Sequence, residues 1–191
     1  MRVGVLAVQG AFAEMAAYWR EQGAETFEIR QLADLERNID LLALPGGEST
    51  VQGKLLHDLG LFEPLKERIQ SGLPVFAVCA GLILLAEKVE DDGGRSGVRP
   101  SQWFGVLPVT VRRNAYGRQL GSFRTVGMFD GKPDVPMTFI RAPSITTVSP
   151  EAEVLSTFNG EPTAVRWRNI TAFTWHPELN AGHFLKLSSP A

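Results

Sequence analysis

Strand-like and helix-like segments alternate through the first half of the chain, and this alternation restricts the fold more than any other feature. Residues 3–8, 41–44 and 75–78 are short apolar runs, typical of strands buried on both faces, and residues 26–29 predict a further short strand. Helical spacing of apolar residues fills the intervening segments, at Phe12, Met15, Ala16 and Trp19, then at Phe62, Leu65 and Ile69. The pattern predicts a three-layer α/β fold, with a mostly parallel sheet flanked by helices.

The second half of the chain contains fewer helical patterns. A helix is expected over residues 80–89, and residues 91–101 predict a flexible polar loop. Strands are predicted over residues 106–111, 137–140, 154–158, 163–168 and 170–175, the last two forming a hairpin. With 191 residues and no linker or internal repeat, residues 1–191 are expected to form one domain.

Composition excludes several classes of protein. The net charge of −2 argues against a basic nucleic-acid-binding protein. The uncharged stretch of residues 73–86 is shorter than the roughly 20 residues that a membrane-spanning helix needs. The single cysteine excludes an internal disulfide and any multi-cysteine metal site. We therefore expect a cytoplasmic protein with no membrane, nucleic-acid or metal partner.

One stretch is unusually basic. Residues 93–129 contain no acidic residue and six arginines, namely Arg95, Arg99, Arg112, Arg113, Arg118 and Arg124. These arginines either form a solvated face paired with carboxylates elsewhere, or mark an anion site or a docking surface for an acidic partner.

Cys79 occupies a position typical of a nucleophile. A lone cysteine is usually a small buried hydrophobic residue. Here, however, an apolar strand ends directly before Cys79, and Ala80 opens the next helical stretch. A sharp strand-to-helix turn exposes its central side chain at the carboxyl edge of the sheet, and a helix N-terminus favours the thiolate.

The chain offers three histidines as a base for this thiol. His57 falls on the polar side of a predicted helix, and His183 lies near the C-terminus. His176 ends the apolar strand 170–175, so it should reach the same edge of the sheet as Cys79. Glu178 follows two residues later and could orient the imidazole, which predicts a Cys-His-acid triad.

Residues 45–49 form a second glycine turn, directly after the strand 41–44. Its structural role would be a tight turn with Ser49 as the helix N-cap. Its functional role would come from Gly46 and Gly47, whose bare backbone can approach a substrate oxyanion. The N–H groups of Gly47 and Ala80 would together form an oxyanion hole.

Six segments carry a family resemblance. They are residues 7–12 (Ala-Val-Gln-Gly-Ala-Phe), 46–50 (Gly-Gly-Glu-Ser-Thr), 79–83 (Cys-Ala-Gly-Leu-Ile), 113–119 (Arg-Asn-Ala-Tyr-Gly-Arg-Gln), 140–143 (Ile-Arg-Ala-Pro) and 176–179 (His-Pro-Glu-Leu). From residue 3 to about 179, the chain resembles the glutaminase subunits of pyridoxal 5′-phosphate synthase, which are class I, or triad, glutamine amidotransferases.

The resemblance implies a flavodoxin-like three-layer fold and hydrolysis of L-glutamine to L-glutamate and ammonia, without a cofactor. The ammonia would pass through a channel to a barrel-shaped synthase subunit that makes the vitamin B6 coenzyme. By motif, Cys79 is the nucleophile, His176 the base and Glu178 its orienting acid. The substrate-binding residues implied are Gly46, Gly47, Glu48, Arg113, Ile140 and Arg141. Gln9 and Gly10 match a family segment near the oxyanion site that responds to the partner.

Three alternatives stay open at this point. The chain could be the glutaminase of another synthase, such as that of histidine biosynthesis, although the arginine-containing segments argue against it. It could be a catalytically silent regulatory domain of the same fold, against which the intact triad argues. A cysteine hydrolase with another substrate would need a histidine soon after the nucleophile, and residues 80–90 contain none.

Overall fold

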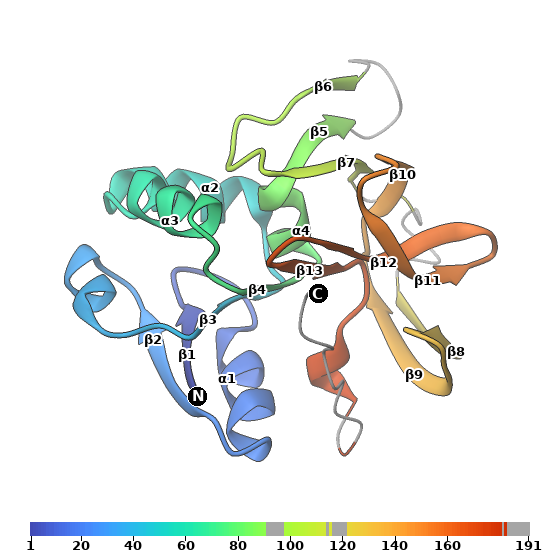
Figure 1. The fold of residues 1–191 in the computed structure, drawn as a ribbon, viewed down its shortest axis with the longest axis horizontal. Helices are drawn as coiled ribbons and strands as arrows, with labels where there is room; N and C mark the ends of the chain where they lie inside the picture. The colour runs from blue at the N-terminus through green and yellow to red at the C-terminus, as the bar shows by residue number, and fades with distance from the viewer. Residues whose placement is uncertain (91–97, 114, 116–121, 181, 183–191) are drawn as a thin grey trace.

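The computed structural model describes residues 1–90, 98–113, 115, 122–180 and 182 of the chain. Within these residues, seven strands form a central sheet in the order β11-β12-β13-β4-β3-β1-β2 (Figure 1). The pairs from β2 to β13 are parallel, and β12 and β11 add to the edge in antiparallel orientation. The mostly parallel sheet predicted from the sequence is confirmed. In chain order the strands are β1 (Arg2–Leu6), β2 (Glu25–Ile29), β3 (Leu41–Leu44), β4 (Val75–Val78), β11 (Glu153–Phe158), β12 (Glu161–Trp167) and β13 (Ile170–Phe173).

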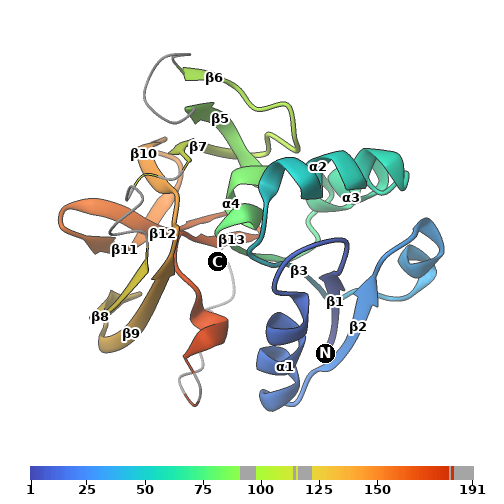
Figure 2. The ribbon, with the colours of Figure 1, turned by 180° about the vertical axis from the view of Figure 1, so that it is seen from behind.

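Helices cover both faces of the parallel part of this sheet. Figures 1 and 2 show α1 (Phe12–Glu21) on one face, and α2 (Ser49–Asp58) and α3 (Phe62–Gln70) on the other. Two separate apolar cores result, because alternate residues of a strand point to opposite faces. Val5 packs with Met15 of α1, whereas its neighbour Leu6 belongs to the core that contains Leu56 and Leu65. The short helices α4 (Ala80–Leu85), η1 (Leu32–Glu36) and η2 (Pro177–Leu179) complete the helical elements described.

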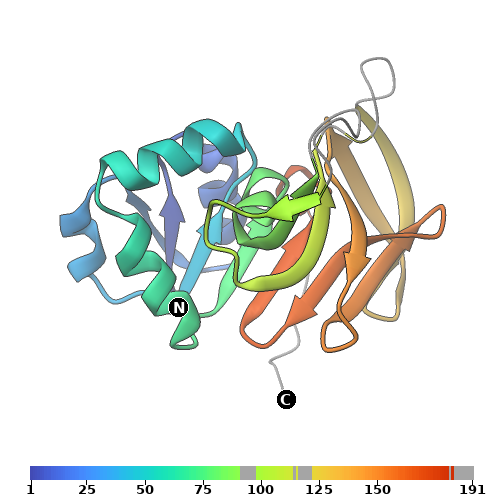
Figure 3. The same ribbon diagram turned by 90° about the horizontal axis from the view of Figure 1, so that it is seen from above.

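Two small sheets continue the outer layers where the helices end. The first has the order β10-β7-β5-β6 and lies beside α2 and α3, as Figure 3 shows from above. Its strands are β5 (Ala86–Glu90), β6 (Val98–Pro100), β7 (Leu107–Arg112) and β10 (Ser144–Val148). The second pairs β8 (Ser122–Phe129) with β9 (Lys132–Ile140) and shares the core of α1 through Phe129 and Phe139. The prediction of a sheet flanked by helices is therefore confirmed, and the two small sheets add to the outer layers in the second half of the chain, where the sequence shows fewer helical patterns.

The strand predictions hold, with a few corrections. Every predicted strand is present, and all but β9 begin and end within two residues of the expected bounds. The helix expected over residues 80–89 is wrong in its second half, because α4 ends at Leu85 and β5 follows at once. Residues 80–86 are all buried, so no amphipathic period distinguishes the two elements. Of the loop expected over residues 91–101, residues 91–97 lie outside the described part and Val98–Pro100 is a strand paired with β5.

The basic stretch separates into residues with different surroundings. Arg112 bonds Glu90 at 2.8 Å, as a solvated ion pair would, and Arg124 is exposed on β8. Arg95 and Arg118 lie outside the described residues. No helix in the described part of the chain is long and apolar enough to cross a membrane, and the cytoplasmic location stays a prediction.

Candidate active site

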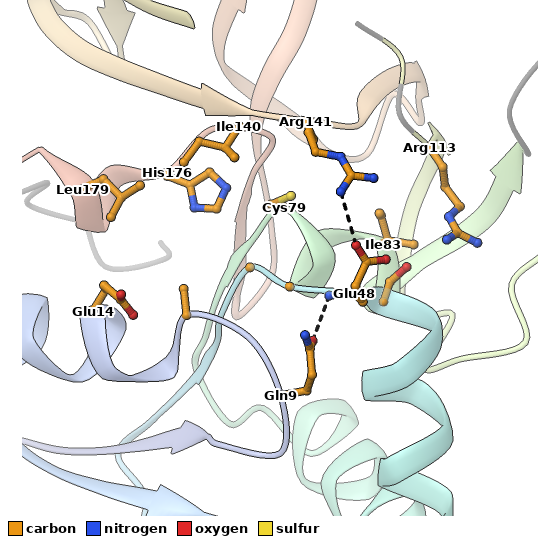
Figure 4. Close-up of a pocket in the computed structure, with 14 residues that line it drawn as sticks. Gln9, Glu14, Glu48, Cys79, Ile83, Arg113, Ile140, Arg141, His176 and Leu179 are labelled. Carbon is orange, nitrogen blue, oxygen red and sulfur yellow. Dashed lines mark hydrogen bonds and ion pairs between the residues drawn. The ribbon is translucent and has the colours of Figure 1, made fainter. Parts of the chain in front are cut away.

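Four strand ends converge at the carboxyl edge of the central sheet. Cys79 follows β4, His176 comes shortly after β13, Gly46 and Gly47 come after β3, and Gln9 comes after β1. Ligands of open α/β sheets bind at this edge, and here a pocket of about 390 Å³ lies there (Figure 4). Its lining is formed by Gln9, Ala11, Glu14, Gly46, Gly47, Glu48, Ser49, Cys79, Ile83, Arg113, Ile140, Arg141, His176 and Leu179.

Cys79 has the backbone of a nucleophile elbow. Its φ of 50° and ψ of −99° reverse the chain between β4 and α4, a conformation that a side-chain-bearing residue rarely adopts. A Cβ on Gly81 would lie 2.5 Å from the carbonyl oxygen of Leu44, so only glycine lets α4 pack this closely on β3. Cys79 is only 8% exposed, and Figure 4 shows its sulfur at the pocket wall.

His176 and Glu178 form a buried pair beside the thiol. Nδ1 of the imidazole lies 2.7 Å from Oε1 of Glu178, and the two side chains are 7% and 0% exposed. The backbone N–H of His176 also donates to the carbonyl of Thr138 in β9, at 2.7 Å. Among the described residues, Nε2 of His176 has no well-formed hydrogen bond. Such bonds are often long in free enzymes and tighten when substrate binds.

The surroundings of His176 favour its charged form. Burial by itself would lower the pKa of this imidazole, but its interactions with Cys79 and Glu178 outweigh burial and raise the pKa to about 10. An imidazolium next to the thiol stabilises the thiolate, which is the nucleophilic form of cysteine. The arrangement is therefore suited to attack on an electrophilic carbon.

The Gly46–Gly47 peptide is held from the side of Gln9. The carbonyl of Gly46 accepts a hydrogen bond from the N–H of Ala11 at 2.9 Å, and the N–H of Glu48 donates to Oε1 of Gln9 at 2.8 Å. In a trans peptide the N–H points opposite to the carbonyl, so the N–H of Gly47 faces away from the Gln9 segment. Figure 4 shows Gln9 and Cys79 on opposite sides of this turn.

At the same turn, the prediction that Ser49 is the helix N-cap is wrong. Ser49 is the first residue of α2, and Glu48 takes the N-cap position without a side-chain cap. Glu48 has an extended backbone, and its N–H donates a hydrogen bond to the side chain of Gln9. Glu48 is therefore the last residue before the helix, and Ser49 lies inside it.

The far end of the pocket is charged. Arg141 and Glu48 approach to 3.7 Å, and both side chains are more than half exposed. Arg113 lines the same end, and Ile83 and Ile140 contribute apolar surface (Figure 4). Two guanidinium groups beside one carboxylate suit a ligand that carries both a carboxylate and an ammonium group.

The structure brings almost all the predicted site residues together. Glu178 does not line the pocket and contacts it only through His176. Ala80 is buried, so that only its backbone N–H could serve a ligand. As the first residue of α4, Ala80 has an N–H without an acceptor inside the helix. Among the lining residues, sequence reasoning missed Glu14, Ile83 and Leu179. Glu14 could have been found, since it lies in the first helical turn after Gln9.

Comparisons with known proteins show the family of this chain. The SNO glutamine amidotransferase family matches residues 5–187. The chain is 53% identical over 180 residues to "Pyridoxal 5'-phosphate synthase subunit PdxT" of Desulfitobacterium hafniense, covering 94% of this chain and 87% of that protein. It is 50% identical to the protein of the same name from Methanocorpusculum labreanum, covering 97% and 94%. A solved structure titled "Crystal structure of glutamine amidotransferase" superposes with a TM-score of 0.83 at 37% identity, covering 93% and 90%. The chain therefore belongs to the SNO glutamine amidotransferase family.

Proposed function

We propose that this chain is the glutaminase subunit of a pyridoxal 5′-phosphate synthase. It hydrolyses L-glutamine to L-glutamate and ammonia, and it delivers the ammonia to a barrel-shaped synthase subunit. The observation that carries the proposal is the buried Cys79, His176 and Glu178 arrangement at one pocket, in a chain 53% identical to a protein named as a subunit of that synthase.

The reaction begins when the Cys79 thiolate attacks the carboxamide carbon of glutamine. The carbonyl oxygen becomes an oxyanion, and the N–H groups of Gly47 and Ala80 donate hydrogen bonds to it. His176 gives its proton to the amide nitrogen, the C–N bond breaks, and ammonia departs. The acyl group stays bound to Cys79 as a thioester. His176, oriented by Glu178, then removes a proton from the attacking water, and glutamate is released.

The charged end of the pocket selects the amino acid. Arg141 and Arg113 bind the α-carboxylate of glutamine, and Glu48 binds its α-ammonium group. The ion pair between Arg141 and Glu48 is exposed and long, so exchanging it for substrate costs little. Ile83 and Ile140 contact the methylene groups of the substrate.

Partner binding controls the oxyanion hole in this proposal. Hydrolysis without an acceptor for ammonia wastes glutamine, so the isolated chain should have low activity. Gly46 and Gly47 have enough backbone freedom to turn the Gly47 N–H away from Cys79. The synthase subunit would order the Gln9–Gly10 segment that contacts this turn, and so fix the peptide.

The test is glutamine turnover by the purified chain, before and after addition of the synthase subunit at fixed salt. We expect activation by a factor of up to about 10²–10³, the effect of losing one oxyanion donor in other enzymes. Cys79→Ser should be inactive in both conditions. Activity that a synthase of another pathway stimulates, but this one does not, would contradict the proposed partner.

A further inference from the structure

Gln52 is a polar residue on the buried face of α2. Residues 49, 52, 53 and 56 form that face, with the i, i+3, i+4, i+7 spacing that normally places apolar side chains against a core. Gln52 is fully buried there. Its Nε2 donates to the carbonyl of Gln9 at 2.9 Å and to the carbonyl of Pro45 at 3.3 Å.

The direction of this side-chain amide follows from its two partners. Both are backbone carbonyls, so only the NH₂ group can face them, and each of its hydrogens has an acceptor. The other end of the amide, Oε1 of Gln52, is buried without a hydrogen-bond partner in the described part of the chain. An apolar side chain of similar size would leave the carbonyls of Gln9 and Pro45 without this donor, so the amide of Gln52 is what connects them.

Gln52 joins the two segments that orient the Gly46–Gly47 peptide. Gln9 belongs to the segment that follows β1. In this segment, the N–H of Ala11 donates a hydrogen bond to the carbonyl of Gly46, and the side chain of Gln9 accepts one from the N–H of Glu48. Pro45 is the residue that leads from β3 into the glycine turn. Nε2 of Gln52 also lies only 2.8 Å from where a Cβ of Gly47 would be, so the amide packs directly against the turn.

We propose that Gln52 is a positioning residue for the oxyanion hole. It ties the Gln9 segment to the glycine turn from inside the protein and thereby raises the fraction of molecules in which the Gly47 N–H is directed toward the Cys79 side before any partner binds. Gln52 is therefore expected to determine how much activity the chain has without the synthase subunit. This inference rests on the proposed function, because it assigns Gln52 to the same reaction.

The test compares Gln52→Met with Leu56→Met in the full chain without its partner. Methionine has nearly the length of glutamine but no N–H groups. Leu56 is equally buried on the same helix face and belongs to the apolar core, so its variant controls for repacking. For Gln52→Met we expect a kcat for ammonia release about 10-fold lower at unchanged KM, and for Leu56→Met a kcat near that of the wild type.

A second readout separates positioning from general loosening of the site. Alkylation of Cys79 by iodoacetamide is a direct displacement that needs no oxyanion hole, so its rate should be unchanged in Gln52→Met. Equal kcat values in the two methionine variants, or an alkylation rate that falls as much as kcat, would overturn the inference. If Gln52→Met does not fold, Gln52→Leu provides the same comparison. If the wild type releases no ammonia from glutamine with or without the synthase subunit, the proposed function itself fails.

Discussion

Replacing Gly46 by alanine should displace the His176 ring and slow glutamine hydrolysis by about 100-fold. A Cβ on Gly46 would lie 2.5 Å from Cε1 of His176, whereas ordinary contact begins at 3.4 Å. The ring and the turn must therefore separate by about 0.9 Å, the difference between these two values. Gly46 has no positive φ, so alanine suits its backbone and the contact alone decides the effect.

The imidazole has little freedom to yield. Its Nδ1 is bonded to Glu178 at 2.7 Å, and the side chain is 7% exposed. If the ring moves, this bond is strained, and if the turn moves instead, the Gly47 N–H leaves its position. A misplacement of about 1 Å costs on the order of 10²-fold in rate. That factor corresponds to about 2.7 kcal/mol of lost transition-state stabilisation.

The assay is steady-state ammonia release from glutamine in the presence of the synthase subunit, together with thermal unfolding. Gly60→Ala is the matched control, because Gly60 has a φ of 69° and nothing within 4 Å of an added Cβ. This control loses stability through backbone strain without touching the site. Gly46→Ala with kcat/KM within about threefold of the wild type, or an equal loss in Gly60→Ala, would refute the reasoning.

Three further predictions follow from the same geometry. Cys79→Ala should retain the fold and lose ammonia release, and persistent activity would exclude Cys79 as nucleophile. Arg141→Ala should weaken glutamine binding by about 1.5–3 kcal/mol, the range for hydrogen bonds to charged groups. The Kd for glutamine is measured by calorimetry in the Cys79→Ala background, and an unchanged Kd would exclude this contact. Because the pKa of His176 is raised from 6.5 to about 10, its protonated form stabilises the fold fully below pH 6.5, and this contribution is lost as pH rises toward 10. The unfolding temperature should therefore fall more steeply between pH 7 and 10 in the wild type than in His176→Gln; parallel curves would contradict the raised pKa.

The sequence could predict the strand ends that hold the candidate catalytic residues, because local patterns suffice for them. The apolar strand directly before Cys79 predicts the elbow, and the structure has the left-handed backbone that an elbow needs. The strand that ends shortly before His176 pairs in parallel with β4, which places both side chains at one edge. The spacing from His176 to Glu178 is local as well, and the 2.7 Å contact confirms that these two residues pair.

Other features depended on residues far apart in the sequence. α4 gives way to β5 because the parallel pairing with β7 needs a strand at Ala86, although residues 80–86 are uniformly buried. β8 was not predicted, since its hydrogen bonds are to β9 and its exposed face mixes the apolar Val126 and Met128 with the polar Ser122 and Arg124.

The sequence alone thus determined the α/β class and placed Cys79 and His176 at one edge of the sheet, since strand periodicity and residue order are local properties of the chain. Only the tertiary structure decided how the glycine turn is oriented. That orientation depends on hydrogen bonds between segments about 40 residues apart, such as those from Glu48 and Gln52 to Gln9. The tertiary structure also shows that Gln52 faces the interior, at a position of the helix where an apolar residue is usual. Such contacts form only when β1 and β3 lie side by side in the sheet, and no local pattern encodes them.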